Sequence, residues 1–171
     1  MGVLQFLRPR PKEKPLDSPI RFVLLHEDGF SLQETEVMKK FQERFGHRLA
    51  LQENPQWSDP GRGIRGFLAT DGDHGALVYE RNDPLPASLL EMLLEQSRLE
   101  REIEEKIRKH AGNVVVHYAS AAARAPALDQ VRFVAKLLLT LAEHRSIIAA
   151  VNISGQGVFA GKQLHSVIWM T

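Results

Sequence analysis

The segment from Gly112 to Ser154 constrains the fold more than any other, because two apolar runs of strand length flank a helical pattern. The first run, 113–118, is rich in valine, which favours strands. The second apolar run is 146–152. Between them, residues 127–144 carry apolar side chains at the spacing of one helix face, namely Val131, Val134, Ala135, Leu138, Leu141 and Ala142. Strand, helix and strand with short links predict a right-handed crossover between two parallel strands.

The first half of the chain repeats this order. Phe22–His26 resembles Asn113–His117, each run ends in histidine, and each is followed by a predicted helix. Apolar pairs at 67–79 and 149–160 each enclose a five-residue turn that ends in glycine, which predicts two antiparallel hairpins. The plan is therefore βαββ, a long helix, then βαββ. Internal duplication is one explanation, and chance similarity between apolar strands is the other.

Proline and charge divide the chain into a tail and a body. Residues 1–19 contain four prolines interleaved with basic residues, which predicts a flexible tail outside the fold. Residues 20–171 form one predicted domain, with halves 20–81 and 112–171 joined by a long helix over 88–110. Ser31 with Glu34 has the spacing of a helix capping box. Segment 47–63 is predicted to be a long loop.

Composition excludes several classes of function. The 171 residues include no cysteine, which rules out disulfides, thiol catalysis and cysteine-ligated metals. The formal net charge is +1, which disfavours nucleic acid as a partner. No apolar run approaches the roughly 20 residues of a membrane helix, so we expect no membrane partner and a cytoplasmic location.

Soft motifs in the middle of the chain resemble a known family. They are the proline pair in Asp83–Pro86 before a long helix, the run His110–Val116, and Asp129 at the start of a helix that leads to an alanine-rich strand. This pattern, over roughly 77–164, resembles a bacterial family of unknown function, the domain of unknown function numbered four-two-six-one. The resemblance implies an α+β fold and no established activity.

The histidines are the candidate site residues. His26 and His117 end the two similar strands. If those strands lie near each other across a pseudo-dyad, the two imidazoles converge, and Glu27, Asp28 and His74 are the candidates to join them. Imidazole and carboxylate groups together serve as metal ligands or as acid–base partners. No motif spacing fixes such a geometry, and a strand histidine commonly makes one backbone hydrogen bond instead. Ser154–Gln163 lacks the spacing of a phosphate-binding loop, which disfavours nucleotide binding.

The sequence thus predicts an α+β protein with a mixed or antiparallel sheet, ferredoxin-like βαββ units and helices packed largely on one face. We expect a non-catalytic binding or protein-interaction module that self-associates as a homodimer and uses no cofactor. Speculative binding residues are His26, Asp28, His74 and His117. The alternative is a small metal-dependent hydrolase that uses the region of His26 and His117.

Overall fold

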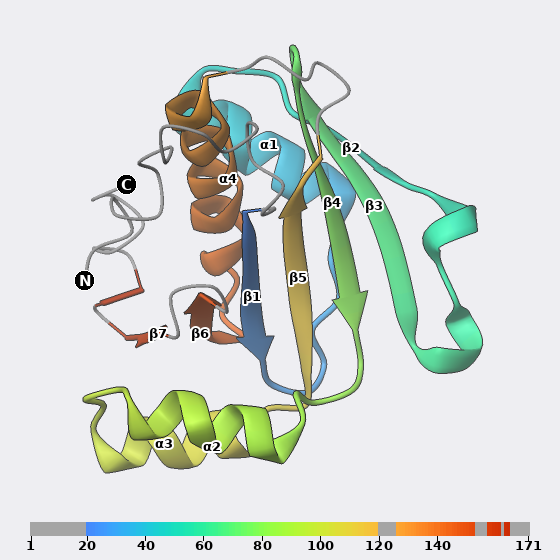
Figure 1. Ribbon diagram of the computed structural model, residues 1–171. Coiled ribbons are helices and arrows are strands. Elements are labelled where there is room, and N and C mark those ends of the chain that lie inside the picture. The colour runs from blue at the N-terminus through green and yellow to red at the C-terminus, as the bar shows by residue number, and fades with distance from the viewer. Residues whose placement is uncertain (1–19, 120–125, 153–156, 162, 165–171) are drawn as a thin grey trace, which may run out of the picture.

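The computed structural model describes residues 20–119, 126–152, 157–161 and 163–164, which form an α+β fold on one sheet (Figure 1). Within these residues the sheet has seven strands in the order β2-β3-β4-β5-β1-β6-β7. All neighbouring strands are antiparallel. The strands are β1 (Arg21–His26), β2 (Ala50–Glu53), β3 (Ile64–Asp71), β4 (His74–Arg81), β5 (Gly112–Tyr118), β6 (Ile147–Asn152) and β7 (Gly157–Ala160). The helices are α1 (Glu34–Phe45), α2 (Ala87–Glu95), α3 (Arg101–Arg108) and α4 (Ala127–Ala142), with short 3-10 turns η2 (Pro55–Trp57) and η3 (Pro60–Arg62).

Strand β1 lies in the middle of the sheet, between β5 and β6. Its residues Val23, Leu24 and Leu25 are all buried, so both faces of the strand are covered. The predicted strands and helix of the 112–154 segment are present as β5, α4 and β6. The prediction that β5 and β6 run parallel is confirmed, since β1 is antiparallel to both, but β1 lies between them and they do not pair with each other.

Helices α1 and α4 contact each other and cover one face of the sheet. Val37 and Phe41 form the buried stripe of α1, as their spacing predicts, and the helix ends at Gly46 in the left-handed region. The predicted capping box is wrong, because α1 begins at Glu34 without a side-chain cap. The strands supply the other half of this core, chiefly through Leu24, Phe67, Val78, Val114 and Val116.

Helices α2 and α3 pack on the opposite face, over β1, β6 and β7. Val23 and Leu25 project to this side of β1 and share a second core with Leu93 and Ile107. The expectation that the helices lie largely on one face is therefore wrong. Two helical layers enclose the sheet at β1, because β1 carries apolar side chains toward both faces of the sheet.

Segment 88–110 forms two helices rather than one. A continuous helix of that length would extend about 34 Å, at 1.5 Å per residue. The chain instead leaves the helix after Glu95, and Arg108 near the end of α3 donates to Glu91 of α2 at 2.9 Å. The second helix thereby turns back and reaches the same core. None of the helices in the described part of the chain is long and apolar enough to span a lipid bilayer.

Both predicted hairpins are confirmed, as the pairs β3–β4 and β6–β7. The predicted loop at 47–63 is wrong in part, because it contains β2 and the turns η2 and η3. The first half therefore has one strand more than the βαββ plan. Turn η2 folds against β3 so closely that a Cβ added at Gly66 would lie 2.5 Å from the Cβ of Trp57.

Candidate functional site

His26 lies at the end of β1 and is only 2% exposed. Its Nδ1 is 2.9 Å from the carbonyl oxygen of Glu27, and its Nε2 is 3.2 Å from that of Arg81. The ring also stacks on Phe30, with 4.7 Å between centroids. Both nitrogens therefore face backbone carbonyl groups inside the protein, and a metal ion could bind only by displacing one of these contacts.

The structure does not bring the predicted site residues together. His26 pairs with Gly112, whereas His117 pairs with Arg21 at the other end of β1. Five residues of strand separate these two positions, which is about 17 Å. The side chains also project to opposite faces, since His26 stacks within the α1–α4 layer and His117 alternates with the core residue Val116.

The other two predicted residues belong to different ends of the sheet. The Nδ1 atom of His74 lies 3.1 Å from the Tyr118 hydroxyl, and its ring stacks on Phe133. Asp28 follows β1 and accepts a hydrogen bond from the amide of Gly29 at the surface. In the described part of the chain, no group of three or more histidine, aspartate or glutamate side chains is placed to hold a metal ion. A binding role for any of these residues stays a prediction.

A small cleft lies between the start of α1 and the end of α4. It encloses about 20 Å³, which is room for about one water molecule. His144 lies at the edge of the cleft. Burial lowers the pKa of its imidazole, and the charge of Glu36 has the opposite, smaller effect. Pockets for small molecules usually measure about 300–1,000 Å³, so this cleft is too small to be one. Its lining is Phe30, Ser31, Leu32, Gln33, Glu36, Val37, Lys40, Thr140, Leu141 and His144.

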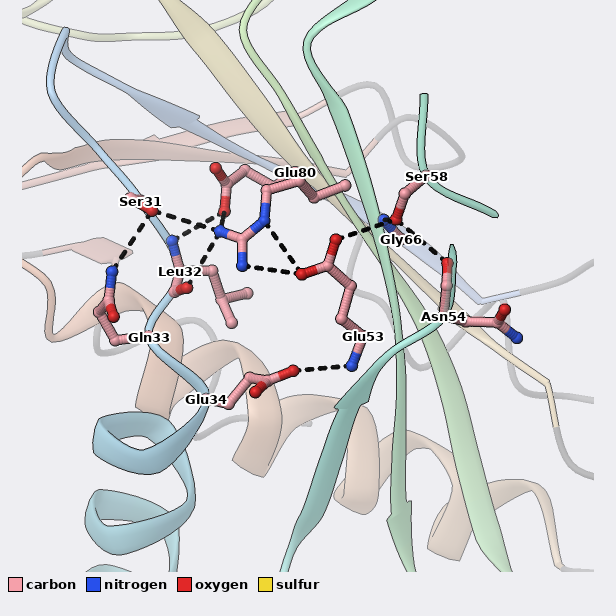
Figure 2. A network of polar contacts seen from close by, with 10 residues as sticks. Ser31, Leu32, Gln33, Glu34, Glu53, Asn54, Ser58, Gly66 and Glu80 are labelled. Carbon is pink, nitrogen blue, oxygen red and sulfur yellow. Dashed lines mark hydrogen bonds and ion pairs between the residues drawn. The ribbon is translucent and has the colours of Figure 1, made fainter. Parts of the chain in front are cut away.

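A polar network next to this cleft joins α1 to three strands (Figure 2). The Glu80 carboxylate of β4 is buried and accepts a hydrogen bond of 2.7 Å from the amide of Leu32. Arg65 of β3 donates to Glu80 at 3.3 Å and to Glu53 of β2 at 3.1 Å. The network satisfies a buried charge and fixes the chain before α1, so its evident role is structural.

Glu34 also belongs to this network, through a contact with β2. Its side chain accepts a hydrogen bond of 2.7 Å from the backbone amide of Glu53, as Figure 2 shows. The carboxylate that the sequence assigns to a capping box therefore contacts strand β2 instead. Because β2 is the last strand of the sheet, this contact occupies an amide that β3 does not use.

The remaining candidate is a sheet surface that no α-helix of the described residues covers, which we call the uncovered face. It consists of Leu68 of β3, Leu77 and Tyr79 of β4, His117 of β5 and Arg21 of β1. Their neighbours along each strand point into the α1–α4 core, so these side chains point the other way. Figure 1 shows β3, β4 and β5 with α1 behind them.

Cross-strand pairing arranges part of the uncovered face in a single row. Leu68 pairs with Leu77, Leu77 with His117, and His117 with Arg21. Burial lowers the pKa of His117, and the charge of Arg21 lowers it further. Leu68 is 37% exposed, and Leu77, Tyr79 and His117 are partly exposed. The row therefore runs from an apolar end to a cationic end.

The uncovered face differs in composition from an ordinary solvated surface. The positions of β3, β4 and β5 that point to this side include no lysine, aspartate or glutamate. Protein interfaces are depleted in these residues and enriched in tyrosine, tryptophan and arginine. Trp57 lies beside this surface, over Gly66, which pairs with Tyr79.

An expected sheet with helices largely on one face implies a free second face, but the residues that form it were not identified from the sequence. A signal was available in Ala76–Tyr79, where four consecutive apolar residues must project to two faces. Only one of those faces is packed by α1 and α4. The sequence could not show which helices cover the second face, or how far they extend over it.

Comparison of the chain with models of protein families, with curated proteins and with solved structures finds no match. The resemblance to the domain of unknown function numbered four-two-six-one is neither confirmed nor refuted, and it stays a prediction.

Proposed function

We propose that the protein is a non-catalytic interaction module that self-associates through the uncovered face. The observation that supports this proposal is a partly exposed surface of Leu68, Leu77 and Tyr79 from which lysine and carboxylate side chains are absent among the described positions. Apolar surface of this kind gains free energy when a partner removes it from water.

The order of residues in the cross-strand row favours a second copy as the occupant. A two-fold axis parallel to the strands would place the β3 end of one sheet over the β1 end of the other. Leu68 of each copy would then face Arg21 of its partner, and no two arginines would meet. The net charge of +1 also gives little long-range repulsion between copies.

The size of the uncovered face sets the strength of the dimer. Four strands spaced about 4.8 Å apart and about five residues long span roughly 19 by 17 Å. The projected area, about 300 Å², is below the roughly 800 Å² that each partner buries in a stable interface. We therefore expect a reversible dimer that dissociates on dilution.

The proposal is tested by replacing Leu68 with a positively charged or a negatively charged residue and comparing the association of the two variants. In the proposed dimer, Leu68→Lys would face Arg21 of the other copy and abolish association, whereas Leu68→Glu would pair with it and retain association. Met92→Lys is the matched control, since Met92 is also exposed but lies on α2. Sedimentation velocity from low micromolar to near-millimolar protein measures the result. Association that Leu68→Lys leaves unchanged would overturn the proposal, as would a wild-type protein that stays monomeric throughout.

The ferredoxin-like character of the fold is a further part of the proposal. β5, α4 and β6 form a split β-α-β unit, with β1 inserted between its strands, and this arrangement is typical of ferredoxin-like folds. The pairs β1–α1 and β5–α4 place both of their helices in one layer, which supports internal duplication. The additional strand β2 distinguishes the two halves.

The alternative, a metal-dependent hydrolase, needs His26 and His117 in one pocket. Their separation along and across the sheet gives this hypothesis no geometric support. Elemental analysis tests it independently of association. One equivalent of zinc, manganese or iron per chain, lost in both His26→Ala and His117→Ala, would favour the hydrolase over the interaction module.

A further inference from the structure

One buried imidazole connects the two ends of the α2–α3 pair. His110 follows α3 and is 4% exposed. Its Nδ1 lies 2.7 Å from the carbonyl oxygen of Ile107, in the last turn of α3. Its Nε2 lies 2.8 Å from the backbone nitrogen of Leu85, in the loop that leads into α2. A single ring therefore holds the entry of this helical pair to its exit.

These two contacts fix the protonation state of the ring. A backbone amide can only donate, so the Nε2 atom of His110 must accept the hydrogen bond from Leu85. Nδ1 then carries the proton and donates to the Ile107 carbonyl. A second proton on Nε2 would place two donors 2.8 Å apart inside the protein, with no acceptor between them.

The charged groups around His110 do not stabilise a second proton. From β1, His26 is the titratable neighbour that acts on the ring. At the end of β4 and in the loop, Arg81 and Asp83 pair with each other. Between the helices, Glu91 of α2 and Glu104 of α3 both pair with Arg108. Burial lowers the pKa of His110, the hydrogen bond to Ile107 raises it, and His26 lowers it.

We propose that His110 is a pH-sensitive switch that releases the α2–α3 pair from the sheet when its ring takes up a second proton. Release would break the bond to Leu85 and expose the apolar side chains of Val23, Leu25 and Val151 beneath the helices. This inference does not depend on the proposed function: α2 and α3 lie on the same side of the sheet as the uncovered face but over β1, β6 and β7, and their release is measured by hydrogen exchange rather than by association.

The direction of the pH effect follows from linkage. In the released state the ring is in water, where its pKa is near 6.5, and in the closed state the pKa is lower. The closed state is therefore favoured fully above about pH 6.5, and release increases as the pH falls below that value. Between the two pKa values, the equilibrium for release changes by up to about tenfold per pH unit.

Hydrogen exchange of the full-length protein tests the switch. Protection factors, corrected for the intrinsic pH dependence of exchange, are compared for α2–α3 and for α4 between about pH 7.5 and about pH 5. We expect protection of α2–α3 to fall by tenfold or more while that of α4 changes less. Parallel loss in all helices, or no loss in α2–α3, would overturn the proposal.

Two glutamine variants separate His110 from other histidines. His110→Gln keeps an acceptor within reach of the Leu85 amide but cannot be protonated, so the pH dependence of α2–α3 should disappear. His144→Gln is the matched control, because the Nδ1 atom of His144 also accepts from a backbone amide, that of Ser146, outside the α2–α3 pair. If the control removes the pH dependence and His110→Gln does not, the assignment is wrong.

A measurement on the wild-type protein covers the case in which His110→Gln does not fold. Nitrogen-15 NMR of the imidazole reports which ring nitrogen carries the proton. At neutral pH we expect His110 with the proton on Nδ1 alone, and a titration whose midpoint coincides with the loss of α2–α3 protection. A proton on Nε2 at neutral pH would overturn the proposal.

Discussion

Leu138 shows how one residue in α4 supports the larger core. It is 1% exposed and lies among the strand residues and the side chains of α1. Val131, Val134 and Leu141 of the same predicted face are also buried. Periodicity identified this face because a helix that covers a sheet must place its apolar side chains on one side.

Leu138→Ala should lower the free energy of unfolding by about 2–5 kcal/mol, the usual range for truncating a buried leucine. The physical cause is the lost apolar contact together with the cavity that remains. Urea denaturation, monitored by circular dichroism, measures the change. Leu128→Ala is the matched control in the same helix, since Leu128 is 43% exposed. A cost below about 1 kcal/mol at Leu138 would show that α4 does not pack as described.

Residue type predicted the burial and the partners of the histidines and of Met92 less well than it predicted the burial of Leu138. His26 and His110 are buried against backbone groups, and each has a partner from a distant part of the chain, Arg81 for His26 and Leu85 for His110. Met92 is an apolar residue of the predicted helix over 88–110, yet it is 40% exposed. A row of apolar residues at helical spacing identifies a buried face only as far as the helix extends. The helix that contains Met92 ends at Glu95.

At the scale of elements, the Arg65 network positions the start of α1 against three strands. Arg65 contacts Glu80, Glu53 and the carbonyl oxygen of Leu32. Without the guanidinium, Glu80 would keep the hydrogen bond from the Leu32 amide but lose its ion pair with Arg65. A buried carboxylate without a counter-charge is costly, and the element that depends on it should loosen.

Arg65→Met should therefore destabilise the protein by about 2–4 kcal/mol, less than the loss of a fully buried pair because Arg65 is partly in water. Glu80→Gln in the same background should recover part of the loss, since it removes the unpaired charge. A double-mutant cycle in urea measures this coupling. Independent, additive effects of the two substitutions would contradict the described contact.

Elements were predictable from local pattern, but their caps and partners were not. The hairpins at 67–79 and 149–160 follow from short turns between apolar runs, and both are present. Glu34 illustrates the limit, because its spacing from Ser31 predicts a cap, whereas β2 supplies a nearer partner in Glu53. That partner lies in a segment too polar to be recognised as a strand.

At the scale of the whole molecule, the feature that determines the sheet topology is the position of β1 between β5 and β6. The sequence of elements predicts a crossover, but it does not say which strand occupies the space between the two crossover strands. Long-range pairing decides that, through registers such as Phe22 with Val116 and with Asn152. The uncovered face follows from the same feature, because α2 and α3 cover only the β1–β6–β7 end.

The tail gives a prediction for the whole molecule, although residues 1–19 lie outside the described residues. Deleting residues 1–18 should change stability by about 1 kcal/mol or less and leave the melting temperature within a few degrees. The reason is that prolines at 9, 11, 15 and 19 oppose regular structure. Differential scanning calorimetry measures the change, and a much larger loss would mean that Val3, Leu4 and Phe6 pack on the body.

The contact between Glu34 and the amide of Glu53 also affects how the protein behaves at high concentration. A terminal strand with free amides is a template on which strands of other molecules can add, and such addition leads to fibrils. β2 is four residues long, and a carboxylate from α1 occupies one of its outward amides. The carboxylate also carries a charge that repels an incoming acidic strand. The protein thus protects this edge of its sheet from open-ended growth, while closed pairing across the uncovered face remains accessible.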